Sequence, residues 1–145
     1  MRQVDRDELV WVIFSALRGW SPTMIRWVFG PRHLRTDAHN RVAADYVARG
    51  QLASLQIIDG AGAELTPEQI SGVIAEAILA MPEAIGDLWT SSIQERKSEA
   101  RATAANLIAD AFAPFEILSA APLPPGQTFF PQVASYEHAL QPRWP

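Results

Sequence analysis

The segment from residue 36 to residue 69 changes its hydrophobic pattern twice, and this constrains the fold more than any other feature of the chain. Its first part, TDAHNRVAADYVARG, predicts a helix. Thr36 or Asp37 can accept hydrogen bonds from the free amides of the first turn, and Gly50 tolerates the left-handed conformation that often ends a helix. The next residues, LASLQIID, are apolar and rich in β-formers, so they predict a strand.

A hairpin and a further helix are predicted directly after that strand. Residues 59–62 (DGAG) are typical of a turn and residues 63–65 can return antiparallel, which predicts a two-stranded hairpin over residues 52–65. Thr66 and Gln69 have the spacing of a capping box. Pro67 suits the first helical position because no amide hydrogen is needed there.

Two more helices are predicted before this segment. In the first, apolar residues recur at helical spacing: Val10, Ile13, Phe14 and Leu17. In the second, Ser21-Pro22 is a start signal and Gly30-Pro31 a stop signal. A short helix, a break and a longer helix with a polar face are what a helix-turn-helix needs.

The order of these elements resembles the winged helix-turn-helix DNA-binding domains of the MarR and PadR type, over about residues 7–80. Those families have a recognition helix that ends in an R-G-L-like turn, a two-stranded wing, and a strand that runs into L-T-P-E. The corresponding residues here are Arg49-Gly50-Gln51-Leu52 and Leu65-Thr66-Pro67-Glu68. The resemblance implies a regulator of transcription that binds double-stranded DNA as a homodimer. Two features depart from the family pattern: the link PRHLR is longer than the usual tight turn, and the wing tip carries no basic residue.

The charge distribution favours the same segment as a DNA-binding surface. The chain has a net charge of −4, but residues 18–49 carry six arginines against two aspartates, a local charge of +4. Arginine neutralises phosphate and can contact a guanine edge through two hydrogen bonds. The predicted DNA-binding residues are Arg32, Arg35, His39, Asn40 and Arg41. An alternative is that the arginines form a solvated face or pair with the acidic second half of the chain.

Roles can be assigned within the predicted recognition helix. Arg35 precedes the helix and is expected to touch phosphate, whereas Asn40 is the expected base reader, since Asn can pair with adenine. Val42, Tyr46 and Val47 are expected to pack inward.

Composition predicts a compact cytoplasmic protein with one hydrophobic core. The chain has 145 residues, 48% of them hydrophobic and 19% charged, without an apolar run of membrane-spanning length. Because its first residues include acids where a signal peptide would have a basic flank and an apolar core, we expect no signal peptide. The three histidines lack the paired spacing of metal ligands, and no Walker loop, H-E-x-x-H or G-x-S-x-G motif occurs. We therefore expect no enzyme, no cofactor, no metal and no membrane partner.

The second half predicts helices and a proline-rich arm. Residues 83–112 carry an apolar stripe with small residues at its seam, which predicts a dimerisation helix or, as the alternative, intramolecular core. Seven of the eleven prolines lie between Pro114 and Pro145, among aromatic residues. This arm, residues 113–145, can cover its own domain, wrap a dimer partner or dock on another protein.

The predicted fold class is mainly α with a small β-hairpin: a winged-helix domain over residues 5–80, a helical segment over residues 83–112, and the arm over residues 113–145. The predicted function is a homodimeric DNA-binding transcriptional regulator. The alternative is a non-enzymatic helical adaptor or inhibitor that binds another protein, because fold does not determine function.

Overall fold

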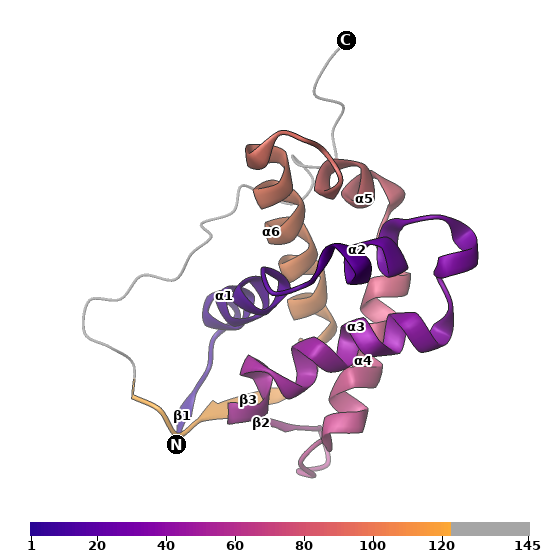
Figure 1. The fold of residues 1–145 in the computed structure, drawn as a ribbon. Helices are drawn as coiled ribbons and strands as arrows, with labels where there is room; N and C mark the ends of the chain where they lie inside the picture. The colour runs from indigo at the N-terminus through magenta and orange to yellow at the C-terminus, as the bar shows by residue number, and fades with distance from the viewer. Residues whose placement is uncertain (123–145) are drawn as a thin grey trace.

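The computed structural model describes residues 1–122, which form a mainly helical body with a small antiparallel sheet at one end (Figure 1). This confirms the predicted fold class, mainly α with a small β component. The α-helices are α1 (Arg6–Leu17), α2 (Pro22–Phe29), α3 (Asp37–Arg49), α4 (Pro67–Leu79), α5 (Glu83–Trp89) and α6 (Gln94–Ala111). Two 3₁₀ helices and three strands complete these residues: η1 (Arg32–Leu34), η2 (Gln51–Ser54), β1 (Arg2–Gln3), β2 (Leu55–Ile58) and β3 (Glu116–Ser119). No helix in this part of the chain combines the length and the apolar character needed to cross a membrane.

The predicted helix starts are confirmed by their caps. Thr36 begins α3 by accepting the amide of His39, and Ser21 begins α2 in the same way. The capping box at α4 is complete, since Thr66 accepts the amide of Gln69 while the Gln69 side chain accepts the amide of Thr66. These local hydrogen bonds satisfy amides that would otherwise have no partner in the first helical turn.

The sheet differs from the predicted hairpin in the identity of its strands. Its order is β1-β3-β2, with antiparallel pairing of Leu55 with Ser119 and of Ile58 with Glu116. The chain does turn at residues 59–62, where Gly62 has a φ of +84°, and it returns to form one bridge between Ile58 and Glu64. The expected second strand is thus a single bridge, because helix α4 starts soon after it. Residues 52–54 belong to η2, so the strand begins later than predicted.

The arm predicted over residues 113–145 contains a turn at residues 113–115 followed by strand β3. Ile117 and Ser119 point into the protein and are buried, which gives this strand the alternation of a half-buried sheet. It occupies the centre of the sheet, between β1 and β2. The remainder of the predicted arm, residues 123–145, lies outside the described residues.

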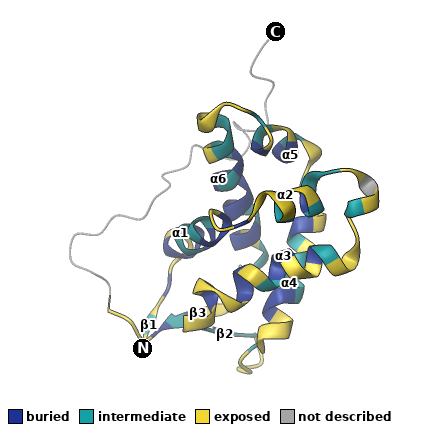
Figure 2. Ribbon diagram, viewed as in Figure 1, coloured by how far each residue is buried: buried dark blue, intermediate teal, exposed yellow. Residues whose placement is uncertain are grey.

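The helices share one hydrophobic core whose buried residues extend from Val4 to Ile117, and the buried parts of the helices face inward (Figure 2). Helix α6 packs against α1, α4 and α5. Its predicted dimerisation stripe is buried inside the chain, including Ala100, Ala104 and Ile108. The alternative expected for this stripe, intramolecular core, is therefore what the structure contains, and the homodimer stays a prediction.

An aromatic cluster joins the helices on one side of this core. Trp89 of α5 stacks on Trp20 with ring centroids 5.3 Å apart and also contacts Phe29 of α2, at 5.2 Å. The indole nitrogen of Trp20 donates to the carbonyl of Ala43, 3.2 Å away, and so connects this cluster to α3. Rigid aromatic packing of this kind fixes the distance between α2, α3 and α5.

Candidate functional site

The predicted base reader, Asn40, is buried and does not face solvent. Only 5% of its surface is exposed, and its Nδ2 donates to the carbonyl of Ala75 in α4, 3.0 Å away. Because this hydrogen bond holds the side chain between α3 and α4, Asn40 is not available on the outer face of α3 to read a base. The predicted role was wrong because the helix is rotated relative to the expected orientation.

The same rotation changes which apolar residues of α3 face inward. Val47 is fully buried, as expected, but Val42 and Tyr46 are 44% and 42% exposed. Small residues form the buried face instead, with Ala43 and Ala44 fully enclosed against the rest of the protein. Helix α3 can approach α4 closely because this face carries little side-chain volume.

His39 also has a structural environment. Its Nδ1 lies 2.7 Å from the carbonyl oxygen of Leu34, and its ring stacks on Trp27 with centroids 4.5 Å apart. These contacts tie the start of α3 to the end of α2. The ring is half-buried, so His39 presents one edge to solvent rather than a free side chain.

The outer face of α3 forms a surface that we call the outer strip: Arg41, Val42, Asp45, Tyr46 and Arg49. Its arginines are held by acceptors of the same protein. Arg41 donates to the backbone carbonyl of Glu68, at 2.6 Å, and lies 3.9 Å from the carboxylate of Asp45. Arg49 pairs with the carboxylate of Glu68, at 3.0 Å.

The pairing of Arg49 with Glu68 affects the pKa of the Glu68 carboxylate. Its own backbone amide and the guanidinium of Arg49 donate to the carboxylate and lower the pKa of Glu68. The outer strip is therefore less positive than the count of arginines predicts. The expected alternative was pairing with the acidic second half of the chain, whereas the observed partners, Asp45 and Glu68, both lie in the first half.

Arg35 differs from the other predicted residues. It lies in the link between η1 and α3, is exposed, and has no hydrogen bond or ion pair within the described part of the chain. Arg32, the remaining predicted DNA-binding residue, belongs to η1, and its side chain lies outside what the structure describes. Arg35 is thus the predicted site residue whose guanidinium is described and available to a partner.

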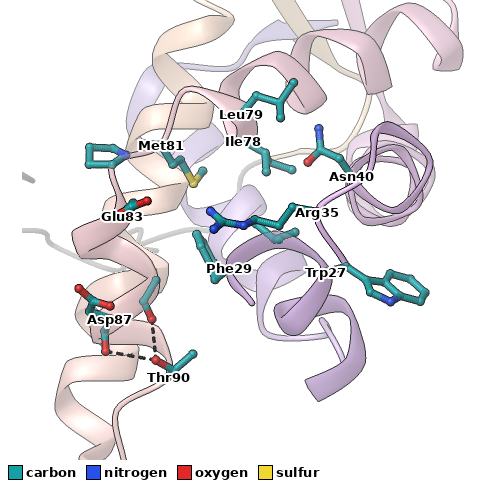
Figure 3. A pocket seen from close by; sticks show the side chains of 13 residues that line it. Trp27, Phe29, Arg35, Asn40, Ile78, Leu79, Met81, Glu83, Asp87 and Thr90 are labelled. Atoms are coloured by element: carbon teal, nitrogen blue, oxygen red, sulfur yellow. Dashed lines mark hydrogen bonds between the residues drawn. The ribbon is translucent and has the colours of Figure 1, made fainter. Parts of the chain in front are cut away.

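Arg35 lines a cleft of about 280 Å³ that we call the α2–α5 cleft. The cleft lies between the end of α2, the link, α3, the end of α4 and helix α5, and its apolar floor includes Phe29, Ile78 and Met81. Figure 3 shows the side chain of Arg35 extending across the cleft from the link toward α5. The break at Pro82 creates the opening, because it turns α5 away from the axis of α4.

Two further groups give the α2–α5 cleft its polar character. The Oδ1 of Asn40 lines it and is buried without a hydrogen-bond partner in the described residues. On α5, Glu83 and Asp87 lie one turn apart along the opposite wall. Thr90 donates its hydroxyl to the carbonyl of Gly86, 2.8 Å away, so this hydroxyl is already occupied (Figure 3).

The cleft was not predicted from the sequence, although one signal for it was present. Pro82 interrupts an otherwise continuous helical stripe, and such a break places two helix ends at an angle. The sequence does not predict that Arg35, which precedes α3, lies close to the break at Pro82. No group of three or more potential metal ligands occurs among residues 1–122.

Comparisons with protein-family models, with curated proteins and with solved structures find no match. The winged-helix resemblance therefore stays a prediction from the residues quoted for it. The site must be interpreted from its own geometry.

Proposed function

We propose that the protein is a non-enzymatic adaptor that binds a short segment of another protein in the α2–α5 cleft. The observation that carries this proposal is the guanidinium of Arg35, which extends over an apolar floor without a partner in the described residues. Arginine and apolar pockets of this kind dominate the binding energy of many protein interfaces. An unpaired arginine needs no internal ion pair to be broken before it binds a partner.

The dimensions of the cleft favour a short segment. A volume of about 280 Å³ is slightly smaller than the roughly 300–1,000 Å³ of typical ligand pockets. It can take one side chain and the adjoining backbone of a peptide, with Phe29 and Met81 beneath the side chain. Polar groups at the edge would then orient the backbone.

A library of linear peptides displayed with random sequences tests this proposal. Peptides selected by the wild-type protein should bind Arg35→Glu at least about tenfold more weakly, since the attractive charge is replaced by a repulsive one. The matched control is Arg26→Glu, which makes the same charge change at an exposed arginine of α2 outside the cleft. Circular dichroism of both variants checks that the helices remain folded.

The adaptor proposal fails if the selected peptides bind both variants and the wild type equally. It also fails if no peptide is enriched over a display without the protein. Equal losses in Arg35→Glu and Arg26→Glu would mean that peptides respond to overall charge, which also contradicts a site in the cleft.

Binding of double-stranded DNA by a winged-helix homodimer is the second candidate. It is favoured by the order α1, α2, α3, β2 and by the exposed guanidinium groups of Arg35, Arg41 and Arg49. In this candidate Arg35 and Arg41 contact phosphate, and base reading falls to the outer strip instead of Asn40. The ion pairs of the outer strip would have to exchange for phosphate contacts.

A titration of random-sequence duplex DNA at several salt concentrations decides between the candidates. Arg35→Ala should reduce the slope of log affinity against log salt by about one unit if this residue contacts phosphate. No salt-dependent binding at low ionic strength would eliminate the DNA candidate. Sedimentation of the same sample tests the homodimer, and a monomer at micromolar concentration would contradict it.

A further inference from the structure

The unpartnered oxygen of Asn40 specifies what a ligand of the cleft must offer. The side chain is 95% buried, and its orientation is fixed because Nδ2 donates to Ala75; rotating the amide would place two acceptors against each other. Oδ1 is then left as a buried acceptor beside the cleft. Such a group lowers stability until a donor reaches it. A ligand with an N–H group would supply that donor.

Arg35 specifies a second group of the ligand. A guanidinium has five donors in a planar fork, which matches the two oxygens of a carboxylate. Arg35 enters the cleft from the residues that precede α3, and Asn40 from the first turn of α3, so both can face one ligand. The apolar floor, formed by Phe29 of α2, Ile78 of α4 and Met81, specifies a third group, an apolar side chain.

We infer that the α2–α5 cleft binds the C-terminal residue of a peptide. The last residue of a chain carries all three groups within a few bonds: its carboxylate pairs with Arg35, its own amide donates to Oδ1 of Asn40, and its apolar side chain packs on the floor. This inference rests on the adaptor function proposed above and names the part of the partner that binds. An internal segment would offer no carboxylate from its backbone.

The acidic wall adds a preference for the residues that precede the C-terminus. Glu83 and Asp87 are exposed on α5 and have no ion pair within residues 1–122. A lysine two positions before the end of the peptide should be favoured over a glutamate, because like charges would repel there.

Three synthetic tripeptides test the inference on the full-length protein. The first is N-acetyl-Lys-Ser-Leu with a free carboxylate, the second has the same sequence as a C-terminal amide, and the third carries N-methyl-leucine. Dissociation constants come from ¹⁵N NMR titrations that follow the side-chain resonances of Arg35 and Asn40. The free acid should bind roughly tenfold more tightly than the amide and than the N-methyl peptide, as expected for the loss of one hydrogen bond to a charged or buried group.

Variants of the protein locate the effect. Arg35→Gln should bind the acid and the amide equally, whereas Arg26→Gln should keep the roughly tenfold difference. Arg26 lies outside the cleft, and neither residue has a hydrogen bond from its side chain in the described residues, so both variants should fold. Asn40 itself is left unchanged because it connects α3 to α4, and the N-methyl peptide tests its oxygen instead.

Several outcomes would overturn the inference. Equal affinity for acid and amide, with shifts at the cleft, would contradict C-terminal recognition but leave the adaptor proposal standing. Library peptides that bind through internal residues and depend on Arg35 would likewise contradict C-terminal recognition and leave the adaptor proposal standing. If 4-methylpentanoate, which has the carboxylate and the side chain but no amide, binds as tightly as the free acid, the ligand is a small carboxylic acid. No shift with any tripeptide at millimolar concentration would also refute the inference.

Discussion

Arg35 and Arg49 are exposed arginines of the same basic segment, yet the protein uses them differently. Arg49, on the outer strip, pairs with Glu68 and helps to hold α3 beside α4. Arg35, at the other end of α3, extends into the α2–α5 cleft without a partner in the described residues. The local charge of +4 read from the sequence therefore overstates the positive surface. A binding surface is distinguished from a contact between helices by arginines whose guanidinium groups have no partner in the same protein, rather than by the number of arginines.

The largest expected effect tests the orientation of α3 on which this comparison depends. Val47 is fully buried and Val42 is 44% exposed, so the same substitution at the two sites should have very different costs. Val47→Ala should lower the free energy of unfolding by about 2 kcal/mol, from lost burial and an internal cavity. Val42→Ala should change it by less than about 0.5 kcal/mol. Urea unfolding monitored by circular dichroism measures both, and equal costs would mean that α3 is rotated.

A second pair of substitutions compares the packing around Gly86, beside Phe29 of the cleft, with the packing around Gly72, beside Arg41 of the outer strip. A Cβ at Gly86 would lie 3.0 Å from the Cβ of Phe29, whereas at Gly72 its nearest neighbour would be Nη1 of Arg41, 3.8 Å away. Gly86→Ala should destabilise the protein by about 1 kcal/mol, since overpacking exceeds the gain in helix propensity. Gly72→Ala should stabilise it by about 0.5–1 kcal/mol, because α4 gains a better helix former without a clash. Effects of the same sign would contradict the difference in packing.

The smallest effect concerns Glu68, the acid of α4 that pairs with Arg49 of the outer strip. Hydrogen bonds from its own backbone amide and from Arg49 lower the pKa of Glu68 in the folded protein. A lowered pKa stabilises the fold at pH values above the unfolded pKa, and this contribution is lost as the pH falls through the folded value. Glu68→Gln should therefore lower the melting temperature slightly at pH 7 and should not lower it in strong acid.

Glu76→Gln provides the control for that measurement. It removes an exposed carboxylate from the same helix, at a position without an ion pair among the described residues. If both variants respond to pH in the same way, the pairing of Glu68 with Arg49 does not contribute to stability.

Local signals in the sequence predicted local structure well. The caps at Ser21, Thr36 and Thr66 were predicted because the groups that form each cap lie within four residues of one another. The fold class followed from these starts and from the apolar periods between them. The turn at residues 59–62 was predicted for the same reason, since the carboxylate of Asp59 accepts hydrogen bonds from the nearby amides of Ala61 and Ala63.

Contacts between distant parts of the chain were not predicted. Asn40 looked like an exposed polar residue because its partner, the carbonyl of Ala75, is a backbone group that any residue could supply. The buried face of α3 was missed because alanines carry a weaker hydrophobic signal than Val42 and Tyr46. Strand β3 was hidden among prolines, and the cleft depends on how the link approaches α5. Each of these features is decided by packing across dozens of residues.

The order of the strands has a consequence for how the protein folds. The central strand, β3, is made after all of the helices described in residues 1–122, whereas its neighbours β1 and β2 come from the first half of the chain. During synthesis β1 and β2 are made before β3, so until then their backbone groups lack the strand with which they pair. Unpaired strands of this kind can pair with other chains. Closure of the sheet therefore joins the two ends of the described chain in one late step that spans most of its length. A protein shortened before Glu116 would lose the central strand of the sheet while keeping the sequence of every helix described from α1 to α6.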